Sequence, residues 1–146
     1  MPKVSIIIVS FNVRSYLVNA IDSILKSNYS SYEIIVVDNN SYDNTVDLIT
    51  DKYSRVNIIS NDENVGFGKA VNQAAKIATG DYFLILNPDT IIEENMINDL
   101  IEYIESNKKI GMVGPKILNS DGSLQLSCKR SFPTIKNALP KIFGLD

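Results

Sequence analysis

Tyr82-Phe83-Leu84-Ile85-Leu86 runs directly into Asn87-Pro88-Asp89-Thr90, and the prediction for the rest of the chain starts from this junction. The apolar run follows Gly80-Asp81 and stops at Asn-Pro, which predicts a buried strand that ends in a polar turn. Asp89 then falls just past the carboxyl end of a strand, where open α/β sheets bind their ligands. A carboxylate there can hold a hard divalent cation and, through it, phosphate oxygens. The alternative is a plain turn into the next helix, with Asp89 or Thr90 as the N-cap.

The composition favours one compact domain over residues 1–146. The chain has 146 residues and 45% apolar content, which is enough for a hydrophobic core. Its 14 basic and 17 acidic residues give a net charge of −3, which disfavours a nucleic-acid binder. No apolar run approaches the roughly 18 residues that a membrane span needs, and the start of the chain lacks a signal-peptide pattern. A cytoplasmic setting is therefore expected.

The chain has no histidine, and Cys128 is its single cysteine. These counts exclude an internal disulfide, a cysteine metal cluster, Ser-His-Asp or Cys-His chemistry and histidine-zinc sites. Any catalysis by this chain must use carboxylates, hydroxyls, amides, lysines or a bound metal.

Short apolar runs alternate with helical patterns along most of the chain. Strands are expected at residues 4–9, 33–37, 56–59, 82–86 and 110–113. Between them, apolar residues recur at three- and four-residue spacing and predict four helices, the last over Met96 to Ile104. Such alternation is typical of an α/β fold with a mostly parallel sheet and helices on both faces. After Pro115 we expect a β-hairpin that turns at Asp121-Gly122, and then a tail with a weak helical pattern from Thr134.

Three of the predicted strands end in polar clusters: Ser10-Phe11-Asn12, Asp38-Asn39-Asn40-Ser41 and Asn87-Pro88-Asp89. If these strands are neighbours, the clusters meet at one carboxyl edge of the sheet. The loop before the third helix adds further polar groups there: Asn64, the backbone near Gly66 and Gly68, Lys69 and Asn72. Together they suit a nucleotide diphosphate, with polar groups for the base and ribose and a metal for the pyrophosphate.

Each of these residues also has a purely structural explanation. Ser10 and Asn12 can cap the first helix, Asp38 can stabilise a turn, and Asp43 is a better candidate for a helix N-cap than for a ligand contact. The glycines can serve tight backbone geometry, Asn72 can bond a neighbouring loop, and Lys69 can be a solvated charge. Their joint placement at strand ends is what favours a binding site.

Other phosphate-binding schemes do not fit. The turn after the first strand is Ser-Phe-Asn, so the Gly-x-Gly-x-x-Gly dinucleotide fingerprint is absent. A P-loop ending at Gly68-Lys69 would need glycine where Glu63 stands and Ser or Thr where Ala70 stands. A phospho-acceptor receiver would need paired acids after the first strand, and there are none.

Four ordered motifs resemble the inverting glycosyltransferase family 2, with the rhamnosyltransferase-like branch the most similar. They are VSIIIVSFN (residues 4–12), EIIVVDNNS (33–41), NVGFGKAVN (64–72) and GDYFLILNPD (80–89). The resemblance covers about residues 3–115, and the hairpin that follows is also similar to that branch. It implies a GT-A (Rossmann-like) fold, a nucleotide-diphospho-sugar donor and Mg²⁺ or Mn²⁺ as cofactor.

By matching position, the resemblance implies a role for each motif. Asp38 would contact the base, and Asp89 would be the metal ligand. Asn87 stands where the family's Asp-x-Asp has its first acid, so one ligand is neutral. The implied donor-binding residues are Ser10, Phe11, Asn12, Asp38, Asn39, Asn64, Gly66, Phe67, Gly68, Asn72 and Asn87.

Inversion needs a general base for the acceptor hydroxyl, which the resemblance places well downstream of Asp89. None of the carboxylates after Asp89 has the expected context: Glu93, Glu94, Asp99, Glu102, Glu105, Asp121 and Asp146. We therefore expect a donor-binding half, with residues 115–146 as the start of a truncated acceptor half.

The function expected from the resemblance is sugar transfer, with rhamnose as a candidate sugar, from a dTDP- or UDP-sugar in cell-surface polysaccharide synthesis. The acceptor would be a saccharide or a lipid-linked molecule. Peripheral association with the inner face of the membrane and a homodimer are open alternatives. So are a non-catalytic nucleotide-sugar-binding module and an α/β domain without any ligand.

Overall fold

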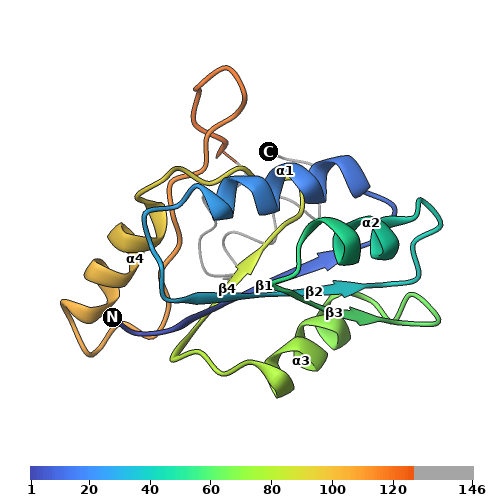
Figure 1. Ribbon diagram of the computed structural model, residues 1–146. Coiled ribbons are helices and arrows are strands. Elements are labelled where there is room, and N and C mark those ends of the chain that lie inside the picture. The colour runs from blue at the N-terminus through green and yellow to red at the C-terminus, as the bar shows by residue number, and fades with distance from the viewer. Residues whose placement is uncertain (127–146) are drawn as a thin grey trace, which may run out of the picture.

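The computed structural model describes residues 1–126 of the chain and shows strands alternating with helices from the N-terminus onward (Figure 1). The strands are β1 (Val4–Ser10), β2 (Tyr32–Asp38), β3 (Val56–Ser60) and β4 (Tyr82–Leu86). The helices are α1 (Arg14–Leu25), α2 (Thr45–Lys52), α3 (Phe67–Ile77) and α4 (Met96–Glu105). All four helices and the first four strands expected from the sequence are confirmed.

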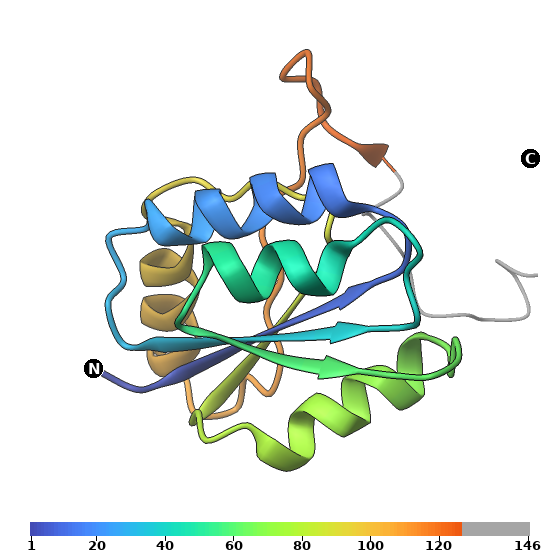
Figure 2. The same cartoon turned by 45° about the vertical axis from the view of Figure 1, so that its right-hand side comes forward.

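The strands form one parallel sheet in the order β3-β2-β1-β4. The chain steps outward from β1 to β3, then returns across the sheet to place β4 on the other side of β1. Because strand-helix-strand crossovers are right-handed, the reversal of direction moves the crossover helix to the opposite face. Accordingly, α1 and α2 lie over one face and α3 under the other (Figure 2). The α/β prediction with helices on both faces is confirmed.

Apolar side chains alternate between two cores, as expected for strands covered on both faces. The larger core packs β-strand residues such as Ile6 and Ile8 against α1, α2 and α4. The smaller core packs Ile7 and Ile35 against Ala70 and Ala74 of α3. The two alanines let α3 approach the sheet closely.

β4 departs from the prediction of a fully buried strand. Only Leu86 is buried, whereas Phe83 and Ile85 are 53% and 51% exposed. Both face the side of α3, which covers β1 and β2 but does not extend over β4. The apolar run at residues 82–86 therefore predicted the strand correctly but did not predict its exposure.

The segment after α4 also differs from expectation. Ile110–Val113 was expected to be a fifth strand, but it forms no ladder within residues 1–126. A strand needs a hydrogen-bonded neighbour, and β-propensity does not supply one. The expected hairpin is reduced to a single antiparallel bridge between Leu118 and Leu124, with its turn at Gly122 (φ +81°). The tail with the weak helical pattern lies outside the described residues.

Within residues 1–126, no helix is long and apolar enough to cross a bilayer. That the 146 residues make up one domain stays a prediction.

Candidate functional site

The polar clusters at the strand ends meet at one edge of the sheet. Ser10 and Asp38 are register partners at the ends of β1 and β2, and the N–H of Asn39 donates to the carbonyl of Ser10 at 2.9 Å. The N–H of Asn61, after β3, donates to the carbonyl of Asp38 at 2.9 Å. On the other side of β1, Leu86 ends β4 opposite Ile8. The sheet thus brings the three predicted polar clusters to one edge, and the end of β3 joins them there.

Asp38 fixes the loop that follows β2. Its carboxylate is buried and accepts hydrogen bonds from the N–H and the hydroxyl of Ser41, at 2.8 Å and 2.6 Å. The Ser41 hydroxyl in turn accepts from the N–H of Asn12 at 2.9 Å. The amide oxygen of Asn12 accepts from the N–H of Tyr42 at 2.8 Å. These contacts join the loop after β1 to the loop after β2 at the carboxyl edge of the sheet.

Three asparagines in these loops have a positive φ: Asn12 at 55°, Asn40 at 66° and Asn44 at 59°. Asparagine is one of the few side chains that tolerate this backbone region. The backbone of α1 begins after Val13, which makes no side-chain cap. Ser10 and Asn12 are therefore not caps of the first helix, and the capping alternative for them is wrong.

The prediction that Asp43 is the N-cap of the helix that follows it is wrong. The N-cap of α2 is Asn44, which makes no side-chain capping bond. The Asp43 carboxylate instead accepts a hydrogen bond from the N–H of Arg14 at 3.0 Å and one from the Thr45 hydroxyl. It thus serves the first residues of two helices, one of them 29 positions earlier in the chain.

Asn39 belongs to a second polar network that the sequence did not reveal. It is 2% exposed, and its amide oxygen accepts from the side-chain amide of Asn61 at 2.9 Å. Asn61 and Gln73 exchange hydrogen bonds through their side-chain amides, at 3.0 Å and 2.9 Å. The network ties the end of β2 to α3 and orients the loop between β3 and α3.

Ser10 carries an unsatisfied hydroxyl. Among the side-chain polar atoms buried in residues 1–126, its Oγ is the one without a hydrogen-bond partner. Buried polar groups are almost always paired, so an orphan at a strand end is typical of a site that takes a ligand or a water. Phe11, the next residue, is 43% exposed and brings an aromatic ring to the same edge.

The loop before α3 presents backbone rather than side chains. The Asn64 amide oxygen accepts from the N–H of Gly66 at 3.0 Å, and Gly66 has φ +82°, a conformation that glycine adopts without strain. α3 then begins at Phe67, which is 53% exposed, and a Cβ at Gly68 would meet no atom within 4 Å. The helix start therefore faces open space at the carboxyl edge.

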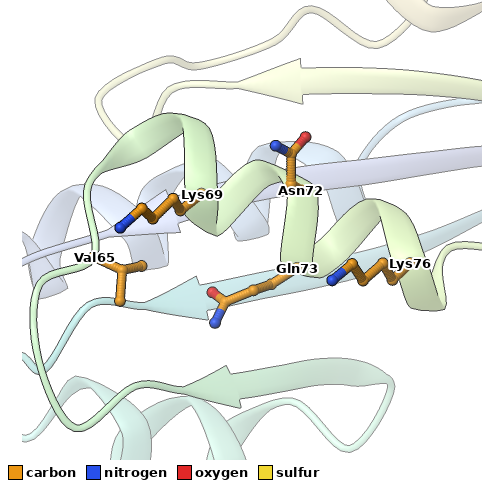
Figure 3. A pocket seen from close by; sticks show the side chains of 5 residues that line it. All are labelled: Val65, Lys69, Asn72, Gln73 and Lys76. Atoms are coloured by element: carbon orange, nitrogen blue, oxygen red, sulfur yellow. The ribbon is translucent and has the colours of Figure 1, made fainter.

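Asn72 is exposed one turn further along α3. Figure 3 shows its side chain on the β4 side of the helix, apart from Lys69, Gln73 and Lys76. These residues and Val65 line a hollow along α3. The hollow contains none of the strand-end residues and no carboxylate, so we place the candidate site at the sheet edge instead.

Asn87 to Thr90 form an exposed turn at the end of β4, closed by the N–H of Thr90 donating to the carbonyl of Asn87 at 3.2 Å. The side chains of Asn87 and Asp89 are exposed. In the part of the chain that the structure describes, no three acidic, cysteine or histidine side chains gather as a metal cage. One carboxylate and one amide still fit Mg²⁺ or Mn²⁺, since such ions take a few protein oxygens and complete their shell with phosphate and water.

Comparison with known protein families identifies the family of this chain. Residues 5–140 match the family model "Glycosyl transferase family 2". The chain belongs to glycosyl transferase family 2. The matched region contains every strand-end residue described above. The resemblance to the rhamnosyltransferase-like branch stays a prediction.

Two named glycosyltransferases are similar to this chain over about three quarters of its length. Glycosyltransferase GlyG of Streptococcus pneumoniae is 31% identical over 114 residues, 76% of this chain and 38% of its own length. The Escherichia coli protein "UDP-Glc:alpha-D-GlcNAc-diphosphoundecaprenol beta-1,3-glucosyltransferase WfaP" is 36% identical over 109 residues, 74% of this chain and 43% of its own length. The chain therefore spans about two fifths of the length of these relatives.

Solved family 2 structures share the fold. The structure of Staphylococcus aureus TarS 1–349 in complex with UDP-GlcNAc superposes with a TM-score of 0.67 at 25% identity. The superposed region covers 73% of this chain and 32% of the TarS chain. This likeness confirms the GT-A-like α/β architecture predicted from the sequence.

Two of the carboxylates considered as a general base make contacts away from the strand-end cluster. The backbone of Glu94 bonds Asn28, before the amino end of β2, and Glu105 accepts from the hydroxyl of Tyr82, at the amino end of β4. Asp121 accepts from Ser123 within the hairpin turn. Asp146 lies outside the described residues. The contacts of Glu94 and Glu105 place these two residues at the amino end of the sheet, away from the carboxyl edge.

Proposed function

We propose that this chain is the donor-binding part of an inverting, metal-dependent glycosyltransferase. It binds a nucleotide-diphospho-sugar at the carboxyl edge of the sheet and, with acceptor-side residues, transfers the sugar to a saccharide or lipid-linked acceptor in cell-surface polysaccharide synthesis. The observation that carries the proposal is the convergence of Ser10, Asp38 and the Asn87–Asp89 turn at one sheet edge in a family 2 chain.

The nucleoside half of the donor is assigned to the β1 and β2 ends. The carboxylate of Asp38 is buried and accepts from Ser41; each oxygen has a further lone pair, which a base N–H would reach once the loop after β2 opens. The buried Ser10 hydroxyl and the exposed Phe11 ring add a polar group and a stacking surface beside it. Asn12 and Asn39 hold the two loops in place through the networks described above.

The diphosphate half is assigned to the start of α3 and the end of β4. The backbone N–H groups of Phe67 and Gly68 begin α3 at the open edge, after Gly66, whose own N–H donates to Asn64, and helix starts favour anions. Asn64 holds this loop, and Asn72 is an exposed amide one turn further along the helix. Asp89 and Asn87 would hold Mg²⁺ or Mn²⁺, and the ion would neutralise the charge of the departing diphosphate.

The acceptor and the general base are assigned to chain beyond the described residues. The printed name of the E. coli relative includes a diphosphoundecaprenol-linked acceptor, which supports a lipid-linked acceptor and a place at the inner face of the membrane for this protein. Its donor is UDP-glucose and the TarS structure holds UDP-GlcNAc, which supports a UDP-sugar beside the dTDP-rhamnose suggested by the resemblance.

The second candidate is a nucleotide-sugar-binding module that performs no transfer. The placement of Glu94 and Glu105 away from the strand-end cluster favours it, because inversion requires a base at the acceptor hydroxyl. The two candidates share the donor site and differ only in turnover. A donor-hydrolysis or transfer assay on the same preparation separates them.

Thermal unfolding tests the donor site directly. The chain is heated with UDP, dTDP or GDP, with and without Mn²⁺, alongside Asp89→Ala and the matched control Glu102→Ala, an exposed carboxylate on α4. A ligand at 100 times its dissociation constant adds about 2.7 kcal/mol to the free energy of unfolding. We expect a metal-dependent rise in Tm for one nucleotide that Asp89→Ala loses and Glu102→Ala keeps.

No rise in Tm with any nucleotide would overturn the proposed donor site. A rise that is the same without Mn²⁺ and in Asp89→Ala would keep nucleotide binding but remove the metal from the proposal.

A further inference from the structure

Three residues after β2, Asn40, Ser41 and Tyr42, form a short flap at the carboxylate of Asp38. Two hydrogen bonds run from the N–H and the hydroxyl of Ser41 to Asp38, at 2.8 Å and 2.6 Å. Two more run to Asn12, whose N–H donates to the Ser41 hydroxyl at 2.9 Å and whose amide oxygen accepts from the N–H of Tyr42 at 2.8 Å. Within residues 1–126, every hydrogen bond from the flap to the rest of the chain ends at Asp38 or Asn12.

The chain on either side of the flap is fixed. The N–H of Asn39 donates to the carbonyl of Ser10 at 2.9 Å, and the carboxylate of Asp43 accepts from the N–H of Arg14 at 3.0 Å. The flap itself adds no side chain to either apolar core of the described residues, and Tyr42 is 78% exposed. Segments that are held by a few polar contacts and bury no apolar surface open at a low free-energy cost. The flap can therefore move while its two ends stay in place.

The flap occupies the polar groups at the ends of β1 and β2. Asp38 is 1% exposed, and both of its carboxylate oxygens accept from Ser41. Ser10, the register partner of Asp38, is fully buried, and in the part of the chain that the structure describes its Oγ has no hydrogen-bond partner. An unpaired buried hydroxyl is uncommon and is typical of a site that accepts a ligand or a water. Opening the flap would make the Asp38 carboxylate accessible next to this hydroxyl.

We propose that Ser41 holds the position of a nucleotide base on Asp38 and is exchanged for the base when the donor binds. The flap opens, the Ser41 hydroxyl leaves Oδ1 of Asp38, and a ring N–H of the base donates to that oxygen instead. The contact that stabilises the nucleotide-free chain therefore opposes nucleotide binding. This inference rests on the proposed donor site and adds the residue that sets the affinity of that site.

The exchange makes stability and affinity change in opposite directions at Ser41. Ser41→Ala removes the hydroxyl and leaves Oδ1 of Asp38 without that partner in the nucleotide-free chain. The base N–H then supplies a missing hydrogen bond and no longer has to replace an existing one. The stability that the variant loses without nucleotide should therefore return in its nucleotide complex. If Ser41 only shaped the loop, the variant would bind the nucleotide more weakly.

Isothermal titration calorimetry in the presence of Mn²⁺ tests this difference. UDP, dTDP and GDP are the probes, because uracil, thymine and guanine each carry a ring N–H, and the tightest binder of the three is used throughout. Ser41→Ala should bind it about 5- to 30-fold more tightly than the parent, although the variant unfolds more easily without nucleotide. Ser41→Thr keeps the hydroxyl and should bind like the parent. Ser54→Ala, at an exposed turn position, is the matched control.

A nucleotide methylated at the ring nitrogen isolates the role of the N–H. The methyl group, at N3 of the pyrimidine or N1 of guanine, removes the hydrogen that would be donated to Asp38. The parent and Ser41→Ala should therefore bind the methylated nucleotide equally, without the gain in affinity.

Amide hydrogen exchange by NMR gives a measurement that needs no variant. In the nucleotide-free parent the N–H of Tyr42 is bonded to Asn12. Because the exchange opens the flap, saturating nucleotide should speed the hydrogen exchange of this amide.

The contrary outcomes separate this inference from the donor site on which it rests. If the parent binds a nucleotide but Ser41→Ala binds it equally or more weakly, the exchange is overturned and the donor site stays. An equal gain in affinity with the methylated nucleotide also overturns the exchange. If Ser41→Ala does not fold, slower or unchanged exchange of the Tyr42 amide in the nucleotide-saturated parent decides against it. Failure of all three nucleotides to bind either protein would overturn the donor site itself, and the inference with it.

Discussion

The side-chain hydroxyl of Ser41 donates to Oδ1 of Asp38 at 2.6 Å, while the backbone N–H of the same serine donates to Oδ2 at 2.8 Å. Asp38 is 1% exposed, so these bonds replace the water that the carboxylate has lost. The hydroxyl also accepts from the N–H of Asn12, which places one oxygen atom between the loops after β1 and β2.

Ser41→Ala should therefore lower the free energy of unfolding by about 1–2 kcal/mol, because it leaves a buried carboxylate oxygen and a backbone N–H without partners. Urea unfolding measures this change. The matched control is Ser54→Ala, at an exposed turn position, which should stay within about 0.5 kcal/mol of the parent. Equal losses in the two variants would show that the Asp38 contact adds nothing to stability.

The sequence predicted the strands and their polar ends correctly because the signals that define them are local. A β-branched run followed at once by Ser-Phe-Asn or Asp-Asn-Asn identifies a strand and its polar end together, and the parallel sheet then brings the ends into one edge. The contacts within the site were not predictable in this way. Asn39, Asn61 and Gln73 meet only because β2, β3 and α3 pack together, and nothing in their local sequence marks the pairing.

The errors concern residues whose structure is decided by distant partners. Ile110–Val113 has strand propensity but no described neighbour to pair with, and Phe83 and Ile85 are apolar but uncovered. Asp43 binds the N–H of Arg14, 29 positions away, instead of capping its own helix. Propensity and periodicity describe one segment at a time, so they cannot report what another segment covers, pairs with or caps.

Gly80 is a position where the packing leaves no room for a side chain. A Cβ there would lie 2.6 Å from the backbone N of Ser5 and 2.9 Å from the carbonyl oxygen of Lys3. The backbone of β1 cannot move without breaking its ladders to β2 and β4. Gly80→Ala should lower the free energy of unfolding by about 2–4 kcal/mol.

Chemical denaturation checks this, with Gly114→Ala as the control. A Cβ at Gly114 would meet nothing within 4 Å, so that variant should change the free energy of unfolding by less than about 0.5 kcal/mol. A stable Gly80→Ala protein would mean that the amino ends of β1 and β4 can separate.

Glu33 makes stability depend on pH at the opposite edge of the sheet. Partial burial opposes its ionisation, but hydrogen bonds from Ser5 and Thr79 and the charge of Lys3 outweigh burial and lower its pKa from 4.5 to about 2. Because the pKa is lower in the folded chain than in the unfolded chain, the ionised group stabilises the fold above pH 4.5. That stabilisation, on the order of 3 kcal/mol, is lost as the pH falls from about 5 toward 2.

Glu33→Gln should unfold more easily than the parent at pH 7 and should lose less stability on acidification. Urea unfolding between pH 2.5 and 7 measures both effects, and Glu102→Gln, on the exposed side of α4, should keep the slope of the parent. Parallel curves for the parent and Glu33→Gln would show that the Ser5 and Thr79 contacts do not shift the ionisation of Glu33.

Asp43 connects two helix starts that have no side-chain cap of their own. Neither Val13 before α1 nor Asn44 before α2 makes a capping bond, and the Asp43 carboxylate accepts from the N–H of Arg14 at 3.0 Å and from the Thr45 hydroxyl. A negative charge at two helix N-termini is favoured by both helix dipoles. Burial raises the pKa of Asp43, but hydrogen bonds from the Thr45 hydroxyl and from backbone N–H groups, including that of Arg14, outweigh burial and lower the pKa below its usual value.

Asp43→Ala should lower the free energy of unfolding by about 1–2 kcal/mol at pH 7, the usual effect of losing a helix cap. Asp43→Asn should recover part of this loss, because an amide oxygen still accepts a hydrogen bond but carries no charge. Asp62→Ala, at an exposed loop position, is the control for removing one acidic charge. Circular dichroism during urea unfolding gives the comparison, and an Asp43→Ala loss no larger than that of Asp62→Ala would contradict a capping role. Since Asp43 anchors the loop that also holds Asp38 and Ser41, the same variant should bind its nucleotide more weakly than Asp62→Ala does.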